Sequence, residues 1–334
     1  MNRRDFIKDF AYTGIGLAIP SYLSSCSNLF DQAGPGKEYN ADIIIVGGGL
    51  GACAAALSAC KQGASVIMTE PTDWIGGQVS QQGVPPDEHQ WIESFGRTEN
   101  YARFRTLIRD YYRKNYRLSN TALQSEYLNP GNGMVSRLCH EPKVALAVLQ
   151  SMLEPFIASG NLRLFLHTKP VKAHVDADSV QSVSCLNVES GDKTVFIGDM
   201  FIDASEDGDL LPLTRTEYIL GSESGLITGE PHAPEKADPG NIQALTWCFA
   251  MDHLEGEDHT LEKPATYDFW KNHIPDLMPE WSGKLLSLNY SNPRTLEPRA
   301  LSFVPPLYTS PAPATSDLNL WLYRRIIDLS LIHI

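Results

Sequence analysis

The sequence predicts an α/β fold built on a parallel sheet, because three patterns follow one another in the order that such a fold requires. A continuous apolar run over 42–46 is typical of a strand that is buried on both faces. A glycine-rich segment follows at once and opens the alanine-rich stretch 50–62, which predicts a tightly packed helix that ends at Gly63. A second apolar run at 65–69 completes a strand–turn–helix–strand unit of the Rossmann type.

Further elements follow this unit. Apolar residues at helical spacing predict helices over 101–116 and 141–159. Short β-strands suggest a small inserted sheet before the chain returns at 200–203, and they span 162–166, 171–175, 180–188 and 194–197. The pattern then weakens, and proline-rich stretches around Pro231, Pro293 and Pro311 indicate a partial second α+β domain.

The composition is that of a globular protein with room for about two domains. The chain has 334 residues, of which 43% are hydrophobic, and its formal net charge is −13. Such an acidic chain offers no basic field that would attract phosphate backbones, so we expect no nucleic-acid partner.

The first 26 residues have the features of an export signal. Arg3 and Arg4 lie in Asn-Arg-Arg-Asp-Phe-Ile-Lys, which matches the twin-arginine consensus at all but its first residue. The apolar run 10–22 is too short to span a bilayer as a mature helix. Leu-Ser-Ser-Cys then predicts lipidation at Cys26, so we expect twin-arginine export and a periplasmic protein held to the membrane by a lipid anchor only.

The cysteine pattern argues against metal centres and disulfides. None of the six cysteines forms a Cys-x-x-Cys pair, so neither a zinc site nor an iron–sulfur cluster is expected. Removing Cys26 leaves five, and an odd number does not suggest a disulfide framework.

The glycine segment carries the chemistry. Gly47, Gly48, Gly49, Leu50, Gly51 and Ala52 form a Gly-x-Gly-x-x-Ala fingerprint between strand and helix. Its glycines allow a tight turn and close approach of a pyrophosphate, which would rest on the helix amides. Glu70 closes the second strand, where a carboxylate can accept the hydroxyl groups of an adenosine ribose. We therefore predict a dinucleotide site.

The stretch 41–86, in which Glu70 is followed by Trp-Ile-Gly-Gly-Gln, resembles the FAD-dependent oxidoreductases of the glutathione-reductase-like superfamily. It is most similar to the group that contains the heterodisulfide-reductase-like flavoproteins. Three further segments match that group's pattern, namely 139–142, 201–209 and 321–325. The resemblance implies FAD as the cofactor and covers about residues 41–328.

By position, the resemblance assigns further cofactor contacts. Gly76, Gly77 and Gln78 would line the ribityl and flavin side, and Val171 would place main-chain groups against the adenine. A family turn of the form Asp-Ala-Thr-Gly aligns with Asp203, Ala204, Ser205 and Glu206. The pattern departs there, because Ser205 replaces threonine and Glu206 replaces glycine.

A second departure concerns the C-terminal part. The family completes its flavin site with a Gly-Asp motif near the end of the chain, but no such pair follows Pro293. We therefore expect a C-terminally truncated protein that binds FAD poorly. The expected segments are a signal at 1–26, a linker at 27–40, the FAD-binding Rossmann-like domain at 41–213, a partial substrate domain at 214–328 and a non-native tail at 329–334.

Flavin chemistry comes mainly from the cofactor, while the protein orients the substrate. Candidate acid–base or substrate-orienting groups in or beside the loops are His89, Arg97, Arg137 and His140. The leading hypothesis is an exported FAD-dependent oxidoreductase that removes a hydride from a small organic substrate, such as a carbohydrate-related compound, and passes electrons to an unknown acceptor. Two alternatives remain: a lyase-like carbohydrate-processing protein with a flavin fold, and a non-catalytic dinucleotide-binding protein.

Overall fold

The computed structural model describes residues 36–243, 245–276, 283–287, 289–292, 295, 297–303 and 318–332. The predicted twin-arginine motif at Arg3 and Arg4, the lipidation site Cys26, and Pro293 and Pro311 lie outside the described residues. Within these ranges, no helix has the length and apolar character needed to cross a membrane.

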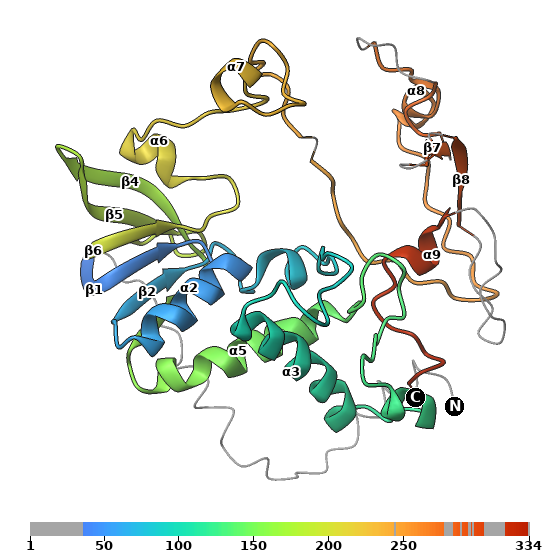
Figure 1. Cartoon of the computed structure of the whole chain (residues 1–334), viewed down its shortest axis with the longest axis horizontal. Coiled ribbons are helices and arrows are strands. Elements are labelled where there is room, and N and C mark those ends of the chain that lie inside the picture. Colours follow the sequence, from blue (N-terminus) through green and yellow to red (C-terminus); the bar gives the residue numbers. More distant parts are fainter. Residues whose placement is uncertain are drawn as a thin grey trace.

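A six-stranded sheet lies at one end of the protein, on the left in Figure 1. Its strands are β1 (Lys37–Val46), β2 (Val66–Thr69), β3 (Leu162–Phe165), β4 (Thr168–Asp176), β5 (Ser179–Asn187) and β6 (Lys193–Asp203). They lie in the order β3-β2-β1-β6-β5-β4, and β3, β2, β1 and β6 are parallel. Because the carboxyl ends of parallel strands share an edge, the residues after Val46, Thr69 and Asp203 come together there.

The predicted α/β fold class is confirmed. The strands that were predicted to form a small inserted sheet belong instead to the main sheet. The segments 194–197 and 200–203 form one strand, β6, whose first half pairs with both β1 and β5. β4 and β5 therefore extend the main sheet as an antiparallel hairpin. β1 also begins at Lys37, within the predicted linker, because Lys37–Ala41 pair with β6 and the Tyr39 ring packs on Phe165.

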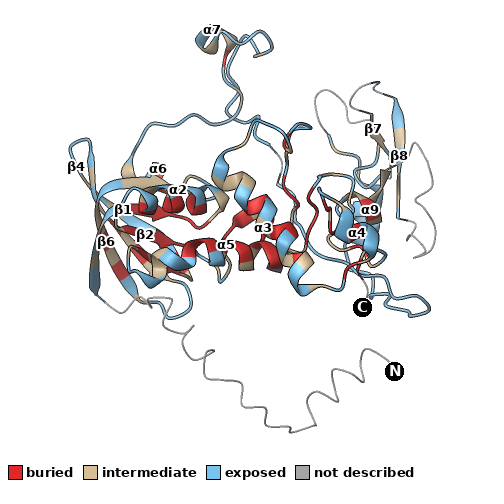
Figure 2. Ribbon diagram, turned by 60° about the horizontal axis from the view of Figure 1, so that its bottom comes forward, coloured by how far each residue is buried: buried red, intermediate tan, exposed pale blue. Residues whose placement is uncertain are grey.

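Helices cover one face of the sheet. They are α2 (Leu50–Lys61) and α5 (Pro142–Ala158), which pack on the strands, and α3 (Glu99–Asn115) packs against α5. Figure 2 shows buried residues on all three helices. α3 begins where the Thr98 hydroxyl accepts a hydrogen bond from the Tyr101 amide (3.2 Å), and α5 begins with a proline in its first turn. The largest apolar cluster lies between these helices and the strands, with Ile45, Met68 and Leu164 at its centre. The short elements η3 (Gly77–Val79) and α4 (Asn120–Gln124) complete this half of the chain.

The other face of the sheet packs against its own hairpin. Ile44 and Val46 of β1 share an apolar cluster with Val183 and Cys185 of β5. Leu210 closes this cluster from α6 (Leu210–Thr214), which follows β6 directly. All five described cysteines are free, and four of them are buried.

The predicted second domain has little core of its own. Its described elements are α7 (Gly225–Thr228), α8 (Tyr267–Asn272), α9 (Leu320–Tyr323), β7 (Asn289–Ser291), β8 (Pro298–Ser302) and β9 (Leu318–Asn319). β7, β8 and β9 form a small second sheet, and large apolar side chains in this part are exposed, Trp247 by 94%. In contrast, Ile332 is buried in the main cluster, and the Leu331 carbonyl accepts a hydrogen bond from the Ser119 amide beside α4.

Candidate functional site

The turn between β1 and α2 runs directly against the carboxyl end of β6. Gly47 has a φ of 102°, and a Cβ at this position would lie 2.1 Å from the carbonyl oxygen of Ala204. The Ala204 amide donates to the Val46 carbonyl at 2.7 Å, so the two segments are held together at this distance. Only glycine fits here, which explains the first residue of the fingerprint.

Glu70 lies beside the second glycine. A Cβ on Gly48 would be 2.5 Å from Oε2 of Glu70, while Oε1 accepts hydrogen bonds from the Thr72 amide (2.8 Å) and hydroxyl (2.7 Å). Burial raises the pKa of Glu70, and the nearby Glu206 carboxylate adds to this effect, although the Thr72 hydrogen bonds oppose it. The predicted ribose-binding carboxylate is therefore buried next to the turn, with one oxygen bound by Thr72.

The amino end of α2 is open to a ligand. Gly49 is its N-cap residue, and no side chain hydrogen-bonds to the first turn. A Cβ on Gly51 would meet nothing within 4 Å, whereas Ala52 is fully buried against the sheet, as predicted for the third fingerprint position. The first amides of a helix have no partner within the helix, so this end presents donors and a positive dipole to an anion.

The Gly76-Gly77 segment supports the turn from the other side. The Gly76 amide donates to the Gly48 carbonyl (2.8 Å), and both Gly76 and Gly77 have positive φ values, of 107° and 50°. Gln78 is held by its side-chain amide, which donates to the Pro85 carbonyl and to the Asp87 carboxylate. The segment predicted to follow Glu70 along the cofactor therefore lies against the glycine turn.

The segment after β6 has two carboxylates with different roles. Asp203 accepts hydrogen bonds from the amides of Ser205 and Leu210 and from the Ser205 hydroxyl, so it builds the turn. Glu206 instead projects its carboxylate across the glycines. A Cβ on Gly77 would lie 2.6 Å from its Oε1, and one on Gly49 would lie 3.2 Å away.

These segments line a cavity of about 680 Å³ at the carboxyl edge of the sheet. It brings together cofactor positions and catalytic candidates that are distant in sequence. Predicted residues on its wall are Gly49, Gly51, Gln78, His89, Arg97, Ala204 and Ser205. Val171 is not on this wall but lies in β4, beside an irregularity in the pairing with β5, and its adenine contact stays a prediction.

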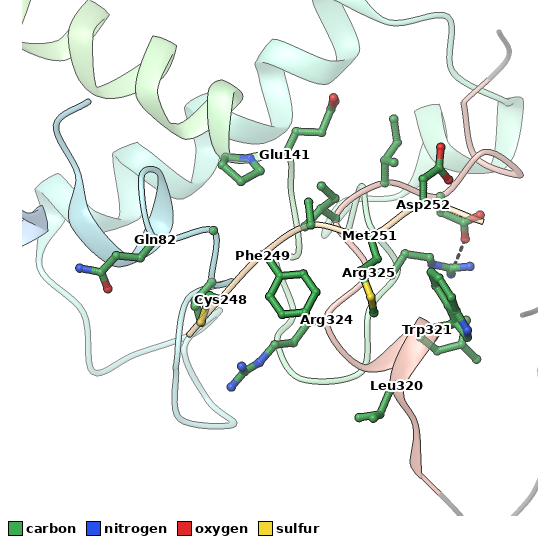
Figure 3. Close-up of a pocket in the computed structure, with 18 of the residues that line it drawn as sticks. Gln82, Glu141, Cys248, Phe249, Met251, Asp252, Leu320, Trp321, Arg324 and Arg325 are labelled. Carbon is green, nitrogen blue, oxygen red and sulfur yellow. Dashed lines mark hydrogen bonds and ion pairs between the residues drawn. The ribbon is translucent and has the colours of Figure 1, made fainter. Parts of the chain in front are cut away.

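A second cavity of about 1230 Å³ lies between the loop at 80–84 and the segments 246–253 and 320–330. Figure 3 shows Phe249 and Met251 in this cavity, with Gln82 on one side, Trp321 on the other and Arg324 below Phe249. Aromatic side chains are frequent on its wall and comprise Trp74, Trp247, Phe249 and Trp321. Polar and charged side chains also line it, among them Gln82, Asp252 and Arg324. Small-molecule sites combine apolar and aromatic surface with polar groups that fix the orientation of the ligand.

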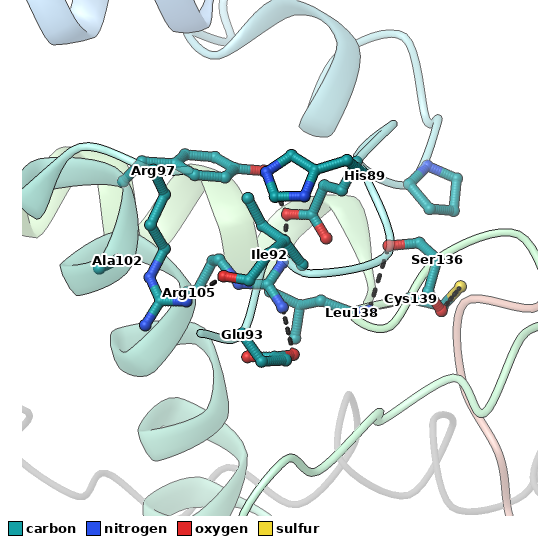
Figure 4. Close-up of polar contacts among 12 residues, drawn as sticks. His89, Ile92, Glu93, Arg97, Ala102, Arg105, Ser136, Leu138 and Cys139 are labelled. Carbon is teal, nitrogen blue, oxygen red and sulfur yellow. Dashed lines mark hydrogen bonds and ion pairs between the residues drawn. The ribbon is translucent and has the colours of Figure 1, made fainter. Parts of the chain in front are cut away.

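A buried charge network anchors the loop 85–97 to α3. Arg105 is 1% exposed and forms ion pairs with Glu88 and Glu93, and Figure 4 shows its guanidinium against Glu93. Arg109 reaches Glu93 at 2.6 Å. Burial acts to raise the pKa of Glu93, but the two arginines lower it below its ordinary value. Glu88 and Glu93 lie on either side of His89 in the sequence, so the network positions the loop that carries this catalytic candidate.

The sequence did not reveal this network, because the apolar spacing of α3 predicts a helix but not the partners of its arginines. The only signal is that Arg105 and Arg109 each lie one position after a buried apolar residue, Phe104 or Ile108. Thr69 and Thr72, which bind the Gly47 amide and Glu70, were also missed.

The four catalytic candidates have different surroundings. His89 is exposed, and its two ring nitrogens contact the Trp91 amide and the Gly96 carbonyl, both at 3.2 Å. Arg97 donates to the Ile92 carbonyl, whereas Arg137 is exposed and lines neither cavity. His140 also lines neither cavity, and its burial lowers its pKa to about 4, so it is neutral. Only His89 and Arg97 are therefore placed beside the cofactor positions.

The sequence profile of the FAD dependent oxidoreductase family matches residues 42–314, most of the chain, which includes the glycine turn, Glu70 and the segment after β6. The chain belongs to this family. FAD is its cofactor. No curated protein sequence matches the chain.

Several solved structures are similar to part of this FAD-dependent oxidoreductase. Adenylylsulfate reductase from Archaeoglobus fulgidus is 20% identical with a TM-score of 0.35, and the match covers 51% of this chain and 31% of that one. Bacillithiol disulfide reductase from Bacillus cereus is 18% identical with a TM-score of 0.31, and the match covers 51% of this chain and 41% of that one. L-proline dehydrogenase from P. horikoshii is 13% identical with a TM-score of 0.29, and the match covers 50% of this chain and 23% of that one. The chain spans less than half the length of these proteins.

The described residues fit the adenosine diphosphate half of FAD. Gly47 and Gly48 let the turn lie directly against Ala204 and Glu70, while Gly49, Leu50 and Gly51 line the cavity and no side chain caps this end of α2. Glu70 keeps one oxygen beside the turn but does not itself line the cavity. The exception is Glu206, whose negative charge lies next to the place where phosphates would settle. The described residues contain no group of histidine, cysteine and acidic side chains that could hold a metal ion.

Substitution of Gly47 tests the geometry of the turn. Gly47→Ala places a Cβ 2.1 Å from a main-chain oxygen at a φ of 102°, so we expect a loss of at least about 3 kcal/mol in the free energy of unfolding. Gly51→Ala is the matched control, because its Cβ meets nothing, and it should be neutral or stabilising by up to about 1 kcal/mol. Urea denaturation measures both, and equal effects of the two substitutions would contradict the placement of Gly47.

The buried His140 makes stability depend on pH. Its pKa falls from 6.5 in the unfolded chain to about 4 in the folded protein, so between these values only the unfolded state binds the proton. The unfolding free energy should therefore fall by about 3 kcal/mol as the pH drops through this window, because one pKa unit corresponds to about 1.4 kcal/mol.

His140→Asn should remove this part of the acid sensitivity, since asparagine can still donate to the Glu141 carbonyl that the ring contacts. Urea denaturation at about pH 7 and about pH 4.5 measures the effect. His89→Asn, at an exposed position, is the control and should retain the loss. An undiminished loss in His140→Asn would show that other groups cause the acid sensitivity.

Proposed function

We propose that this protein is an exported FAD-dependent oxidoreductase that oxidises a small hydroxylated substrate of the carbohydrate class. The observation that carries the proposal is the glycine turn with Glu70 and the open end of α2 at the carboxyl edge of the sheet. Bound FAD supplies a two-electron acceptor. The substrate carbon would lose a hydride and its hydroxyl a proton, which leaves a carbonyl, and the electrons would pass to an acceptor of unidentified nature.

The larger cavity supports the substrate class. Trp247, Phe249 and Trp321 offer aromatic faces, which can pack on the C–H faces of a sugar ring. Gln82, Asp252 and Arg324 add donors and acceptors for hydroxyl groups (Figure 3). Oxidation additionally needs a group that takes the hydroxyl proton, and His89 is the candidate beside the cofactor positions. Because His89 lines the smaller cavity and not the larger one, this role requires the substrate hydroxyl to reach the smaller cavity. Both ring nitrogens of His89 are engaged, so this role also requires release of the Gly96 or Trp91 contact.

A flavin titration of the whole protein tests the proposed reaction. We expect a yellow complex with FAD whose visible absorbance is bleached without air by a sugar or polyol, with one carbonyl product formed per flavin reduced. Bound flavin that no such substrate reduces, together with eliminative cleavage of a polysaccharide, would favour the lyase-like alternative. A protein that binds a nucleotide but no flavin would favour the non-catalytic alternative.

Glu70→Gln separates cofactor affinity from stability. Loss of a charged acceptor for the ribose hydroxyls should weaken FAD binding by about tenfold, because a hydrogen bond to a charged group contributes about 1.5–3 kcal/mol. The apoprotein should be equally stable or more stable near neutral pH, since the raised pKa of Glu70 means that folding disfavours its ionised form, and this cost disappears at acidic pH. Fluorescence titration and urea denaturation measure the two effects. Glu189→Gln, at an exposed position, is the control.

We also propose that the twin-arginine machinery exports the protein and that Cys26 carries its lipid anchor, which is its only attachment to the membrane. The Arg3-Arg4 motif and the Leu-Ser-Ser-Cys sequence support this location on the periplasmic side. Twin-arginine export suits a flavoprotein, since this route carries folded proteins that have already bound their cofactor.

Exchange of Arg3 and Arg4 for lysine should leave the precursor in the cytoplasm, and Cys26→Ala should abolish labelling by a fatty acid. Cell fractionation and lipid labelling measure these outcomes, with Lys8→Arg as the control. Normal export of the double-lysine variant would contradict the twin-arginine route, and labelling of Cys26→Ala would contradict the lipidation site.

A further inference from the structure

The carboxylate of Glu206 lies at the meeting point of three segments that form the cofactor site. Its Oε1 is so close to the main chain that a Cβ on Gly77 would lie 2.6 Å from it and one on Gly49 3.2 Å. Gly49 caps α2, and Gly77 opens η3. Glu206 also lines the smaller cavity together with Leu50 and Gly51 of the first turn of α2. This carboxylate therefore lies on the path to the α2 amides.

The turn after β6 does not need Glu206. Asp203 accepts the hydrogen bonds that shape it, from Ser205 and from the Leu210 amide (2.9 Å), and the Ser205 hydroxyl accepts one from the Asp209 amide (2.7 Å). Glu206 is exposed, and none of the hydrogen bonds or ion pairs among the described residues involves its carboxylate. Its side chain can therefore move or be replaced while the turn is kept.

The negative charge of Glu206 affects the binding of an anion at the amino end of α2. The amino end of α2 attracts an anion, and the Glu206 carboxylate is an anion that belongs to the protein itself. A pyrophosphate brought to the same amides would carry negative charge next to Glu206 and Glu70, and like charges at short distance repel. The other charged groups on the cavity wall are Asp87, Glu88 and Arg97, together with His89 when it is protonated. Asp87 and Glu88 are acidic, so Arg97 is the only side chain of fixed positive charge on the described part of this wall.

We propose that Glu206 competes with the pyrophosphate of FAD for the amino end of α2, so that it lowers the affinity of the site for FAD and swings away when the cofactor binds. The proposal rests on the FAD site assigned to the glycine turn. It assigns to Glu206 a role in cofactor affinity, and it predicts that nucleotides are discriminated by the charge that they bring to this position.

Titration of the full-length apoprotein tests this role. FAD binding is followed by quenching of flavin fluorescence in the wild type, Glu206→Gln and Glu206→Gly. Removing one like charge from the phosphate position should lower the Kd for FAD by about tenfold in both variants. Asp207→Asn is the matched control, because it removes the same charge at the adjacent exposed residue, and its Kd should change by less than about twofold.

Two adenine ligands locate the effect at the phosphates. The Glu206 variants should bind ADP more tightly by a similar factor, whereas their affinity for adenosine, which has no phosphate, should not change. Equal or weaker FAD and ADP binding by both Glu206 variants would overturn the proposal, as would a gain of the same size in Asp207→Asn. If FAD and ADP bind to the wild type but Glu70→Gln binds both with unchanged affinity, the assigned FAD site itself is wrong.

Discussion

The closest approach in the cofactor site is between two main chains, at Gly47 and the carbonyl of Ala204. This approach brings the ends of β1 and β6 together, and the hydrogen bond from the Gly76 amide to the Gly48 carbonyl adds a third segment. Because no side chain intervenes, the first amides of α2 face the cavity instead of apolar neighbours. The geometry of the candidate cofactor site depends on this contact.

Three carboxylates lie at this edge of the sheet, and they differ in burial and in their hydrogen-bond partners. Asp203 is saturated by donors of its own turn, Glu70 is buried with one oxygen bound by Thr72, and Glu206 is exposed and accepts no hydrogen bond from the described residues. The first shapes the backbone and the second is suited to hydroxyl groups. The third adds negative charge where phosphates are expected. An acidic edge of this kind makes cofactor affinity a balance between the α2 dipole and the local charge.

Buried ion pairs determine the position of the loop that carries His89. Ion pairs from Arg105 to Glu88 and Glu93 hold it on α3, and removing one partner from such a buried network leaves an uncompensated charge. The aromatic cavity at 246–253 and 320–330 lies in a part of the chain with exposed apolar residues and few buried ones. Buried ion pairs therefore anchor the loop that carries the candidate His89, whereas the segments around the larger cavity have few buried residues.

The sequence by itself determined the strand–turn–helix–strand unit, the glycine turn and the acidic residue at its end, because these depend on backbone conformation and on spacing within about thirty residues. Only the tertiary structure decided that Arg105 and Arg109 are buried, that β6 is one continuous strand, and where the Glu206 carboxylate points. The physical reason is the range of the interactions. Local patterns constrain φ and ψ, whereas the partner of a charge or of a strand edge is set by packing between segments that are distant in sequence.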